Sequence, residues 1–463
     1  MTGQPSNPLA DPLTDHPRPG AMDGGFFGHP RGLSTLFFTE MWERFSYYGM
    51  RAFLILYMVH ALGFDDKHAG SIYGTYTASA WAAAIFGGII ADRWLGQYKS
   101  VLIGGIIIAA GHFTLAFHPL PFFYTGLALI VVGTGLLKPN VSGIVGSLYE
   151  TNDARRDAGF SIFYMGINLG AALGPFIAGY LAQRVDWHIG FACAGVGMTL
   201  GLVQYVLGRK RLQPAVERLE RQRREARAKT PAAVEGRPAS SQPIFAGFTK
   251  SEWKRLAAMA VFFVFAAVFW GAYEQAGSTL NLFGDRYTRT SILGFSFPSS
   301  WFLTIQAIFV IVLAPAFAWL WMRLGKYEPS TPAKFAIGLF FIGLSFVFLL
   351  IPAFRLQDSP SVRVSPFWLV GCYFIQELGE LSISPVGLSV FTKLSPVKIV
   401  GFMLGVWFLA DSVGNKVAGF AAGFISSAPL PELFGVIAAV CLGSSVIAFA
   451  IIKPVRGLMG GVH

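Results

Sequence analysis

Twelve apolar runs constrain the fold of this chain more than any other feature of its sequence. A helix needs about 20 apolar residues to cross a bilayer. Only 13% of the 463 residues are charged, against about 25% in soluble proteins. The sequence therefore predicts an all-α membrane protein with twelve transmembrane helices. The expected spans are 34–62, 70–93, 99–118, 121–148, 158–183, 188–208, 254–283, 299–323, 333–353, 366–392, 399–426 and 433–453.

A basic stretch between the sixth and seventh runs divides the chain into two halves. Its first part, 209–229, is predicted to be an exposed charged helix, and its proline- and serine-containing remainder a flexible linker. Two six-helix bundles around a central site are typical of secondary transporters and indicate the fold of the major facilitator superfamily. We expect an N-terminal tail, a first bundle, a linker, a second bundle and a C-terminal tail over 1–32, 33–208, 209–252, 253–454 and 455–463.

Lysine and arginine are unevenly distributed among the connections. Those after even-numbered runs hold most of them, including 13 of the chain's 36 within residues 209–255. Cytoplasmic loops of membrane proteins carry such an excess, so we expect both termini in the cytoplasm of a bacterial-type inner membrane. The distribution explains the net charge of +11 better than nucleic-acid binding does. Residues 1–32 contain no apolar core of a cleavable signal peptide.

The first run is unusual because residues 40–57 contain two carboxylates, two guanidiniums and three tyrosines. An ion at the centre of a bilayer costs about 2.5–3.5 kcal/mol even on lenient insertion scales. We therefore expect the polar face of this helix to line a watery cavity or to meet countercharges from other helices. Four side chains share that face, because their spacing follows the helical repeat: Glu40, Arg44, Tyr47 and Arg51.

Ionisable residues in later runs are the candidates for these countercharges. Lys138 lies in the fourth run beside Pro139, which interrupts the hydrogen-bond ladder of a helix. Buried polar residues can also serve only to join helices, and this alternative is strongest for Asp411 and Lys416. Because both halves contribute charges, we expect the polar residues to converge where the bundles meet. The candidates beyond Lys138 are Glu274, Glu377, Glu380, Asp411, Asn415 and Lys416.

The connection after the second run reads Gly87-Gly-Ile-Ile-Ala-Asp92-Arg93-Trp-Leu-Gly96-Gln-Tyr-Lys99. It resembles the loop motif G-x-x-x-D-[RK]-x-G-x-x-[RK] of the major facilitator superfamily, with one extra residue before Gly96. An acid near a helix end, beside basic residues in a turn that glycine permits, suits a gating element. We expect Asp92, Arg93 and Gly96 to have a gating or structural role and not to bind substrate.

Motifs in the first, fifth, seventh and tenth runs make a more specific resemblance. Glu40-x-x-Glu43-Arg44-Phe resembles the E-x-x-E-R-F signature of the proton-dependent oligopeptide transporters. Phe163-Tyr164-x-x-Ile167-Asn168-x-Gly170 resembles the F-Y-x-x-I-N-x-G signature of that family. Phe269-Trp270 with Glu274-Gln275-x-Gly277-Ser278, and Glu380-x-x-x-Ser384-Pro385, match its patterns in the later runs. The motifs occur in order and on the expected runs.

The resemblance implies a substrate site for short peptides. Arg51 and Lys138 would receive the peptide carboxylate, and Glu380, with Asn168 nearby, would receive the amino terminus. A zwitterionic peptide needs a cation and an anion at opposite ends of its cavity, and planar guanidinium suits carboxylate recognition. Helix packing remains the alternative for Tyr164 and Trp407. The other implied substrate-site residues are Tyr47, Tyr48, Tyr164, Ser384 and Trp407.

The resemblance also implies a role for charged residues in proton coupling. Glu40, Glu43 and Arg44 would take part in it, and Glu274 would be the protonatable partner of Arg51. On this hypothesis, an Arg51–Glu274 bridge and a Lys138–Glu380 bridge link the halves. Exchange of these bridges would bias the outward- and inward-open states.

The sequence departs from the family pattern at several places. Gln306-Ala307 stands where the family often has Asn-Pro, and Trp81 where tyrosine is common. Both positions should face the ligand in relatives, so Gln306 and Trp81 remain substrate-site candidates that bear on peptide preference. The linker lacks the two extra helices of many bacterial members. Gly74 lies near the level of a histidine in animal members, so proton coupling would rest on carboxylates.

These observations predict a proton-coupled symporter that imports di- and tripeptides, acts as a monomer in the lipid bilayer, and needs no cofactor or metal. One alternative keeps the fold but moves another small anion such as nitrate, which Arg51 and Lys138 could also bind. Glu380 counts against it, because such an anion has no amino group. A second alternative is a membrane-embedded enzyme. Against it, the histidines form no catalytic pattern, and no serine or cysteine has a nucleophile-elbow context.

Overall fold

All twelve predicted runs are helical in the computed structural model, which describes residues 25–150, 153, 155–229, 248–359, 361–396 and 399–460. The first bundle contains α1 (Arg31–His60), α2 (Asp66–Ile90), α3 (Gln97–Leu115), α4 (Leu120–Ser147), α5 (Arg156–Arg184) and α6 (Trp187–Leu207). The second contains α8 (Lys250–Tyr273), α9 (Thr279–Arg286), α10 (Trp301–Leu324), α11 (Thr331–Asp358), α12 (Phe367–Leu394), α13 (Val400–Ala422) and α14 (Leu430–Ala450). The predicted all-α fold class is confirmed.

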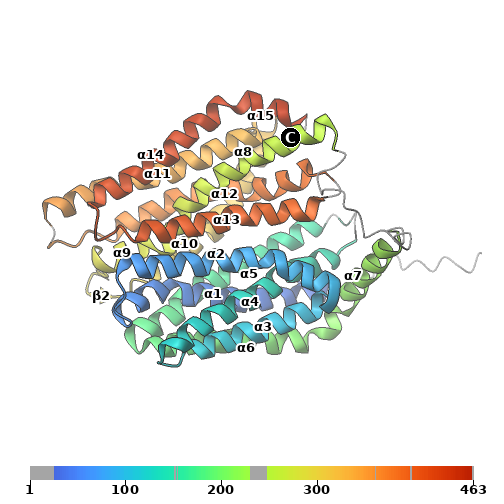
Figure 1. Cartoon of the computed structure of the whole chain (residues 1–463), viewed down its shortest axis with the longest axis horizontal. Coiled ribbons are helices and arrows are strands. Elements are labelled where there is room, and N and C mark those ends of the chain that lie inside the picture. Colours follow the sequence, from blue (N-terminus) through green and yellow to red (C-terminus); the bar gives the residue numbers. More distant parts are fainter. Residues whose placement is uncertain are drawn as a thin grey trace, which may run out of the picture.

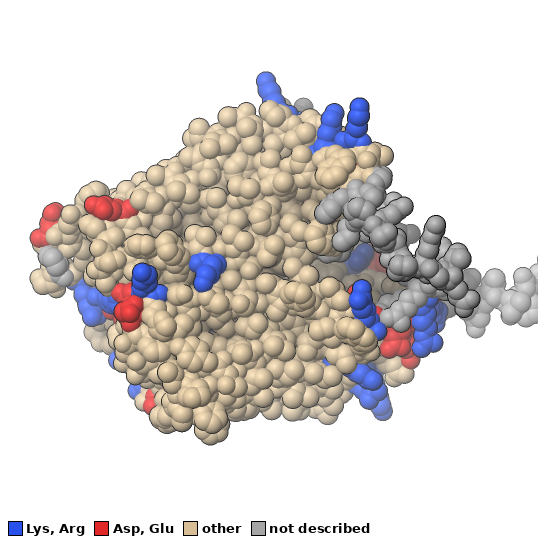
Figure 2. Space-filling model, viewed as in Figure 1, with Lys and Arg blue, Asp and Glu red and all other residues tan. Residues whose placement is uncertain are grey.

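The surface of the molecule is suited to a bilayer. Figure 2 shows lysine, arginine, aspartate and glutamate gathered toward the two ends of one face, with a broad and almost uncharged band between them. Within the described residues, eight helical segments are long and apolar enough to cross a membrane. They are α3, α4, α5, α6, α8 continued by α9, α10, α11 and α14. The chain is therefore a multi-pass membrane protein, and acyl chains would cover this band.

The two bundles lie side by side (Figure 1). In the first, α1 packs against α5 and α6, and α3 against α4; in the second, α11 packs against α12 and α14. The largest contacts between bundles join α2 to α13 and α5 to α10. We call the end where α1 stops and α2 starts the turn end. The opposite end, where α1 starts and α7 (Arg209–Lys229) lies, is the linker end.

Glycines let α2 and α13 approach closely near the turn end. A Cβ on Gly419 would overlap the backbone of Gly70 and Gly74. A Cβ on Gly74 would lie 2.9 Å from the Cα of Gly419. Small residues allow the backbones of membrane helices to come into contact. These three glycines therefore set the spacing of the bundles here.

We expect Gly419→Leu to separate the bundles at this crossing, because the added side chain has no room against α2. The side chains of Thr75 and Lys416 are hydrogen-bonded across the same crossing at 2.6 Å. A disulfide between cysteines placed at these two positions should form roughly tenfold more slowly in Gly419→Leu, as measured by mass spectrometry of the linked peptides. Gly443→Leu is the matched control, since a Cβ there meets no atom within 4 Å. An unchanged rate in Gly419→Leu would contradict the prediction.

Charged residues also join the bundles at the turn end. Arg286 of α9 donates hydrogen bonds of 2.8 and 2.6 Å to the carboxylate of Asp66 at the start of α2. His60 Nε2 lies 2.7 Å from an oxygen of Asp285. A short antiparallel hairpin of β1 (Ser291–Ile292) and β2 (Phe295–Ser296) lies in the connection that follows α9. The turn end is thus held by polar contacts as well as by close helix packing.

The structure differs from the sequence-based expectation in three places. The seventh run is not one helix, because α8 ends at Tyr273 and a 3₁₀ turn over Glu274–Gly277 precedes α9. The predicted charged helix is present as α7 but is not wholly exposed, since Leu212 and Ala215 are buried against the first bundle. The predicted C-terminal tail begins within a helix, α15 (Ile452–Met459), which packs on α8.

The first helix of each bundle begins within a few residues of the expected limit. α1 begins at Arg31 where the first bundle was expected from 33, and α8 begins at Lys250 where the second was expected from 253. Most of the expected N-terminal tail, the proline-containing part of the linker and the last three residues lie outside the described residues.

Candidate functional site

The polar face of α1 is buried between helices. Glu40, Glu43 and Arg44 are at most 3% exposed. Arg44 Nε donates to the Glu43 carboxylate and lies 3.2 Å from Glu40 Oε1. Both carboxylates belong to α1 itself, so this guanidinium meets its countercharges on its own helix. One guanidinium between two carboxylates leaves the cluster with a net negative charge, and a single proton would make it neutral.

Arg51, two turns further along α1, does meet a countercharge from the other bundle. Its Nη2 donates to Glu274 Oε2, and the two side chains are 5% and 6% exposed. The predicted Arg51–Glu274 pair is therefore present. It links α1 to the segment between α8 and α9. Breaking a buried pair by removing one partner is costly, because the other charge is left uncompensated.

The break in the seventh run positions Glu274 for this contact. The carboxylate stands where α8 gives way to the 3₁₀ turn. Arg51 Nε also donates a 2.5 Å hydrogen bond to Tyr73 Oη. A Cβ on Gly277 would overlap that phenol oxygen and would lie 3.0 Å from Arg51 Nη2. Glycine at this position therefore lets the turn reach the guanidinium.

Lys138 of α4 lies against an aromatic ring and not against a carboxylate. Its Nζ is 2.7 Å from the centre of the Trp81 ring, a cation–π contact. The Trp81 ring stacks on Phe408 of the second bundle, with 5.9 Å between ring centres. Glu40, Glu43 and Asp411 lie within electrostatic reach of Lys138. The proposed Lys138–Glu380 bridge is not formed in this structure, in which Glu380 Oε2 is buried without a hydrogen-bond partner.

Two carboxylates of α12 lie on the opposite side of the central region. Glu377 accepts a 2.9 Å hydrogen bond from Tyr273 Oη and is fully buried. Glu380 is 6% exposed, and the phenol of Tyr164, from α5, lies beside it. Asn168 Nδ2 donates to the Tyr164 backbone carbonyl at 3.0 Å. The structure therefore places Glu380, Tyr164 and Asn168 in one neighbourhood across the two bundles.

The remaining substrate-site candidates lie in three different surroundings. The Tyr48 ring lies between two guanidiniums, 5.9 Å from each of Arg44 and Arg51, and the Tyr47 ring is 5.3 Å from Arg44. Trp407 is only 6% exposed and packs on Phe335 and Phe391 inside the second bundle, which agrees with the packing alternative. The other two candidates are Gln306, which is buried with Nε2 unpartnered, and Ser384, half-buried one turn beyond Glu380.

The loop motif lies at the linker end, away from these residues. Asp92 and Arg93 belong to a single π-turn, Ala91–Leu95, that follows α2. Gly96 closes the turn with φ of 77°, a backbone conformation that favours glycine. Gln97 Nε2 donates to Asp92 Oδ1 at 3.0 Å. This geometry fits the structural role expected for the motif.

The polar residues of α13 bond both within the helix and across to α2. Asn415 Nδ2 donates to Asp411 Oδ1 at 2.7 Å within α13, and Lys416 donates to Thr75 of α2 at 2.6 Å. Lys416, although exposed, therefore joins two helices, as the alternative interpretation of this residue supposed.

The sequence-based reasoning missed Tyr73, Tyr273 and Gly277 as site residues. Tyr73 and Tyr273 are hydrogen-bonded to Arg51 and Glu377, and Gly277 leaves room for the Arg51 side chain. Gly277 and Tyr273 stand next to or within the seventh-run motif, so the motif itself carried the signal for them. Tyr73 could have been found as a hydroxyl within an apolar span, where such groups usually have a partner.

Apart from the Arg44 cluster, which contains its own two carboxylates, the first bundle presents the basic side chains Arg51 and Lys138. The second bundle presents the acidic side chains Glu274, Glu377 and Glu380. A solute with one carboxylate and one amine could bridge these groups. Within the described ranges, no cluster of three or more His, Cys, Asp or Glu could hold a metal ion.

Comparison with known proteins gives a consistent result. A model of the POT family matches residues 98–218 and 217–437. The chain is 41% identical to an uncharacterized transporter, YclF, of Bacillus subtilis, over 95% of this chain and 96% of that one. It is 36% identical to a di-/tripeptide transporter of Lactococcus lactis, over 95% and 98% of the two chains. A crystal structure of a peptide transporter POT in complex with sulfate superposes with a TM-score of 0.84, at 39% identity, over 94% and 97% of the two chains.

Proposed function

The chain belongs to the POT family, and from this premise we propose that it is a proton-coupled symporter that imports di- and tripeptides by alternating access. The family and its relatives are transporters and not enzymes, which excludes the alternative that the chain is a membrane-embedded enzyme. The Lactococcus lactis relative is named a di-/tripeptide transporter, and this supports the substrate class. Protons serve as the coupling ion, and no other cofactor takes part.

The proposed setting is an inner membrane with both termini in the cytoplasm. The abundance of arginine and lysine in α7 supports the cytoplasmic position of the linker end. The turn end then faces outward. All the central polar residues come from the two bundles of one chain, which supports a monomer as the working unit.

In the proposed binding mode, Arg51 and Lys138 hold the peptide carboxylate and Glu380 holds the amino terminus. The position of Lys138 and Trp81 on one bundle and of Glu380 on the other supports this mode. Asn168 and Tyr164 lie beside Glu380. Tyr47 and Tyr48 line the site for peptide side chains, with Gln306 and Ser384 near its second-bundle wall. Trp407 supports that wall from within the core.

Proton coupling in this proposal uses two carboxylate clusters. The observation that carries it is the buried Arg51–Glu274 pair, which joins the bundles at a helix break. A proton on Glu274 removes its charge and releases Arg51 for the peptide carboxylate. A proton on Glu40 or Glu43 neutralises the cluster around Arg44. Binding of proton and peptide thus shifts the balance between two states of the bundles.

The experiment that tests this function is uptake of labelled di-alanine into proteoliposomes containing the purified chain. We expect accumulation above the external concentration with an inward proton gradient and an inside-negative potential, and its collapse when a protonophore is added. Empty liposomes are the control. No accumulation of di-alanine under any gradient, together with uptake of nitrate, would instead support the small-anion alternative.

A further inference from the structure

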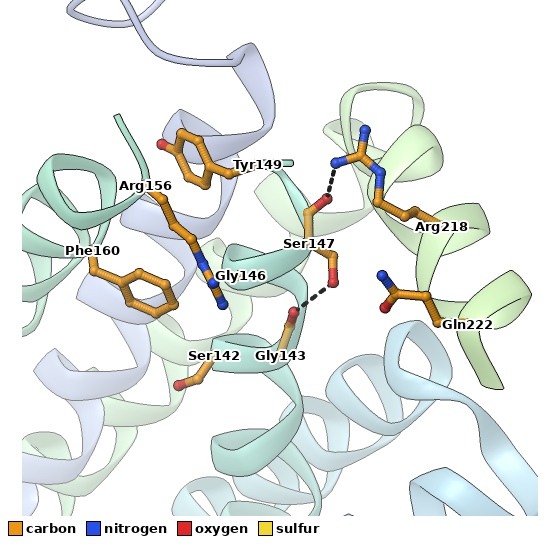
Figure 3. A pocket seen from close by; sticks show the side chains of 9 residues that line it. All are labelled: Ser142, Gly143, Gly146, Ser147, Tyr149, Arg156, Phe160, Arg218 and Gln222. Atoms are coloured by element: carbon orange, nitrogen blue, oxygen red, sulfur yellow. Dashed lines mark hydrogen bonds between the residues drawn. The ribbon is translucent and has the colours of Figure 1, made fainter. Parts of the chain in front are cut away.

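A polar cavity lies at the linker end, separate from the central residues. It has a volume of about 220 Å³ and opens between the end of α4, the start of α5 and α7. Figure 3 shows its walls, with Arg156 and Phe160 from α5 on one side and Arg218 and Gln222 from α7 on the other. Its lining residues, which we call the linker-end cavity, are Ser142, Gly143, Gly146, Ser147, Tyr149, Arg156, Phe160, Arg218 and Gln222.

Two guanidiniums and no carboxylate line this cavity. Arg218 Nη1 donates to the Ser147 carbonyl at 3.0 Å, which fixes α7 against α4. Arg156 extends over the Phe160 ring at 6.0 Å, and its Nη2 is 3.5 Å from where a Cβ on Gly146 would stand (Figure 3). Neither arginine is in an ion pair with a described carboxylate. Two positive charges therefore face one small space.

The neighbouring charged pair does not neutralise them. Asp153 accepts hydrogen bonds of 3.1 and 2.8 Å from the side chain of Arg155. These bonds lower the pKa of Asp153 to about 2, so the carboxylate is ionised at neutral pH and is matched by Arg155. The charges of Arg156 and Arg218 remain unmatched beside it.

We propose that the linker-end cavity binds a phosphate group. Guanidiniums recognise phosphate oxygens by paired, charge-assisted hydrogen bonds, and the Gln222 amide and the Ser142 hydroxyl add donors at the rim. The two positive charges favour an anion, and the volume of about 220 Å³ has room for a phosphate group. A bound phosphate would join α4, α5 and α7 and tie the linker helix to the first bundle.

The phosphate could belong to an anionic phospholipid or to a soluble phosphate ester. The amphipathic α7 is suited to the first source, an anionic phospholipid. Its Leu212 and Ala215 are buried, while Lys210 and Arg221 are exposed. Basic amphipathic helices at a membrane surface attract anionic lipids. Both sources present the same group to Arg156 and Arg218. The experiment therefore supplies each separately.

The test uses the full chain in a neutral detergent without peptide, so its outcome is independent of the proposed transport function. One arm measures retention of phosphatidylglycerol against phosphatidylcholine by native mass spectrometry. The other measures binding of radiolabelled inorganic phosphate by equilibrium dialysis in 100 mM sodium chloride. The variants are Arg156→Gln/Arg218→Gln, which removes both charges, and Gly146→Leu, which fills the cavity and keeps them. Lys210→Gln/Arg221→Gln is the control with the same charge change outside the cavity.

We expect at least one probe to bind the parent chain and to lose roughly tenfold or more in affinity in both cavity variants, but not in the control. Retention of phosphatidylglycerol alone assigns the lipid source, and binding of inorganic phosphate assigns the soluble one. Equal loss in the control pair would overturn the proposal, because binding would then follow the overall charge of α7. Binding of neither probe, or full binding in Gly146→Leu, would overturn it as well.

Discussion

Glu274→Gln is expected to abolish gradient-driven accumulation of di-alanine, to roughly a tenth of the parent level or less. Glutamine keeps the shape of the side chain and can still accept a hydrogen bond from Arg51, but it cannot take up or release a proton. The buried pair of Arg51 and Glu274 joins the bundles, so the variant loses the coupling between a proton and the contact that links them. The measurement is accumulation in proteoliposomes under an inward proton gradient.

Exchange of labelled for unlabelled di-alanine across the membrane separates coupling from binding in this variant. Exchange requires binding and the movement of the bundles but no net proton flux, so it should persist in Glu274→Gln. Glu432→Gln is the matched control, because this carboxylate is exposed at the start of α14. Accumulation at the parent level in Glu274→Gln would refute the assigned role of this carboxylate.

Glu380→Gln is expected to weaken binding of di-alanine by roughly 10- to 150-fold, which corresponds to a charge-assisted hydrogen bond of about 1.5–3 kcal/mol. Glu380 is buried and one of its oxygens has no partner, so it has a free acceptor for an ammonium group. The glutamine side chain removes the charge that compensates a peptide amine. The measurement is the dissociation constant of di-alanine by calorimetry or by competition for uptake.

An acetylated peptide tests whether Glu380 binds the amino terminus of the substrate. N-acetyl-di-alanine has no amino-terminal charge, so its affinity should be low in the parent chain and nearly unchanged by Glu380→Gln. Glu377→Gln is the buried control on the same helix, because Glu377 accepts a hydrogen bond from Tyr273 and is fully buried, whereas Glu380 is 6% exposed. A similar loss of affinity for both peptides in Glu380→Gln would show that the substitution acts through packing and not through the amine.

The helices and their polar faces could be predicted because the signals are local. Apolar length gave all twelve runs, and the helical repeat placed the charged residues of α1 on one buried face. The resemblance to the family, and not the spacing, paired Arg51 with Glu274, which are far apart in the chain.

Other partners depended on how the helices cross. Arg44 could have met a carboxylate from any neighbouring helix, but Glu40 and Glu43 lie within reach on α1 itself. Lys138 was expected opposite Glu380, yet the crossing of α2 and α4 places its ammonium on the Trp81 ring. The Arg44–Glu40 contact follows the i,i+4 spacing of one helix. The partner of Lys138 cannot be obtained in that way, because an error of one turn moves a side chain by about 5 Å.

The sequence by itself therefore determined the number, position and buried faces of the membrane helices, the division into two halves and the family. These properties follow from hydrophobic length, helical period and short motifs, which act over one helix at a time. Only the tertiary structure decided where the seventh run breaks, which glycines bring α2 to α13, and which side chains lie against Lys138. These three features depend on distances of a few ångströms between segments far apart in the chain. Those distances are set by the packing of all the helices together.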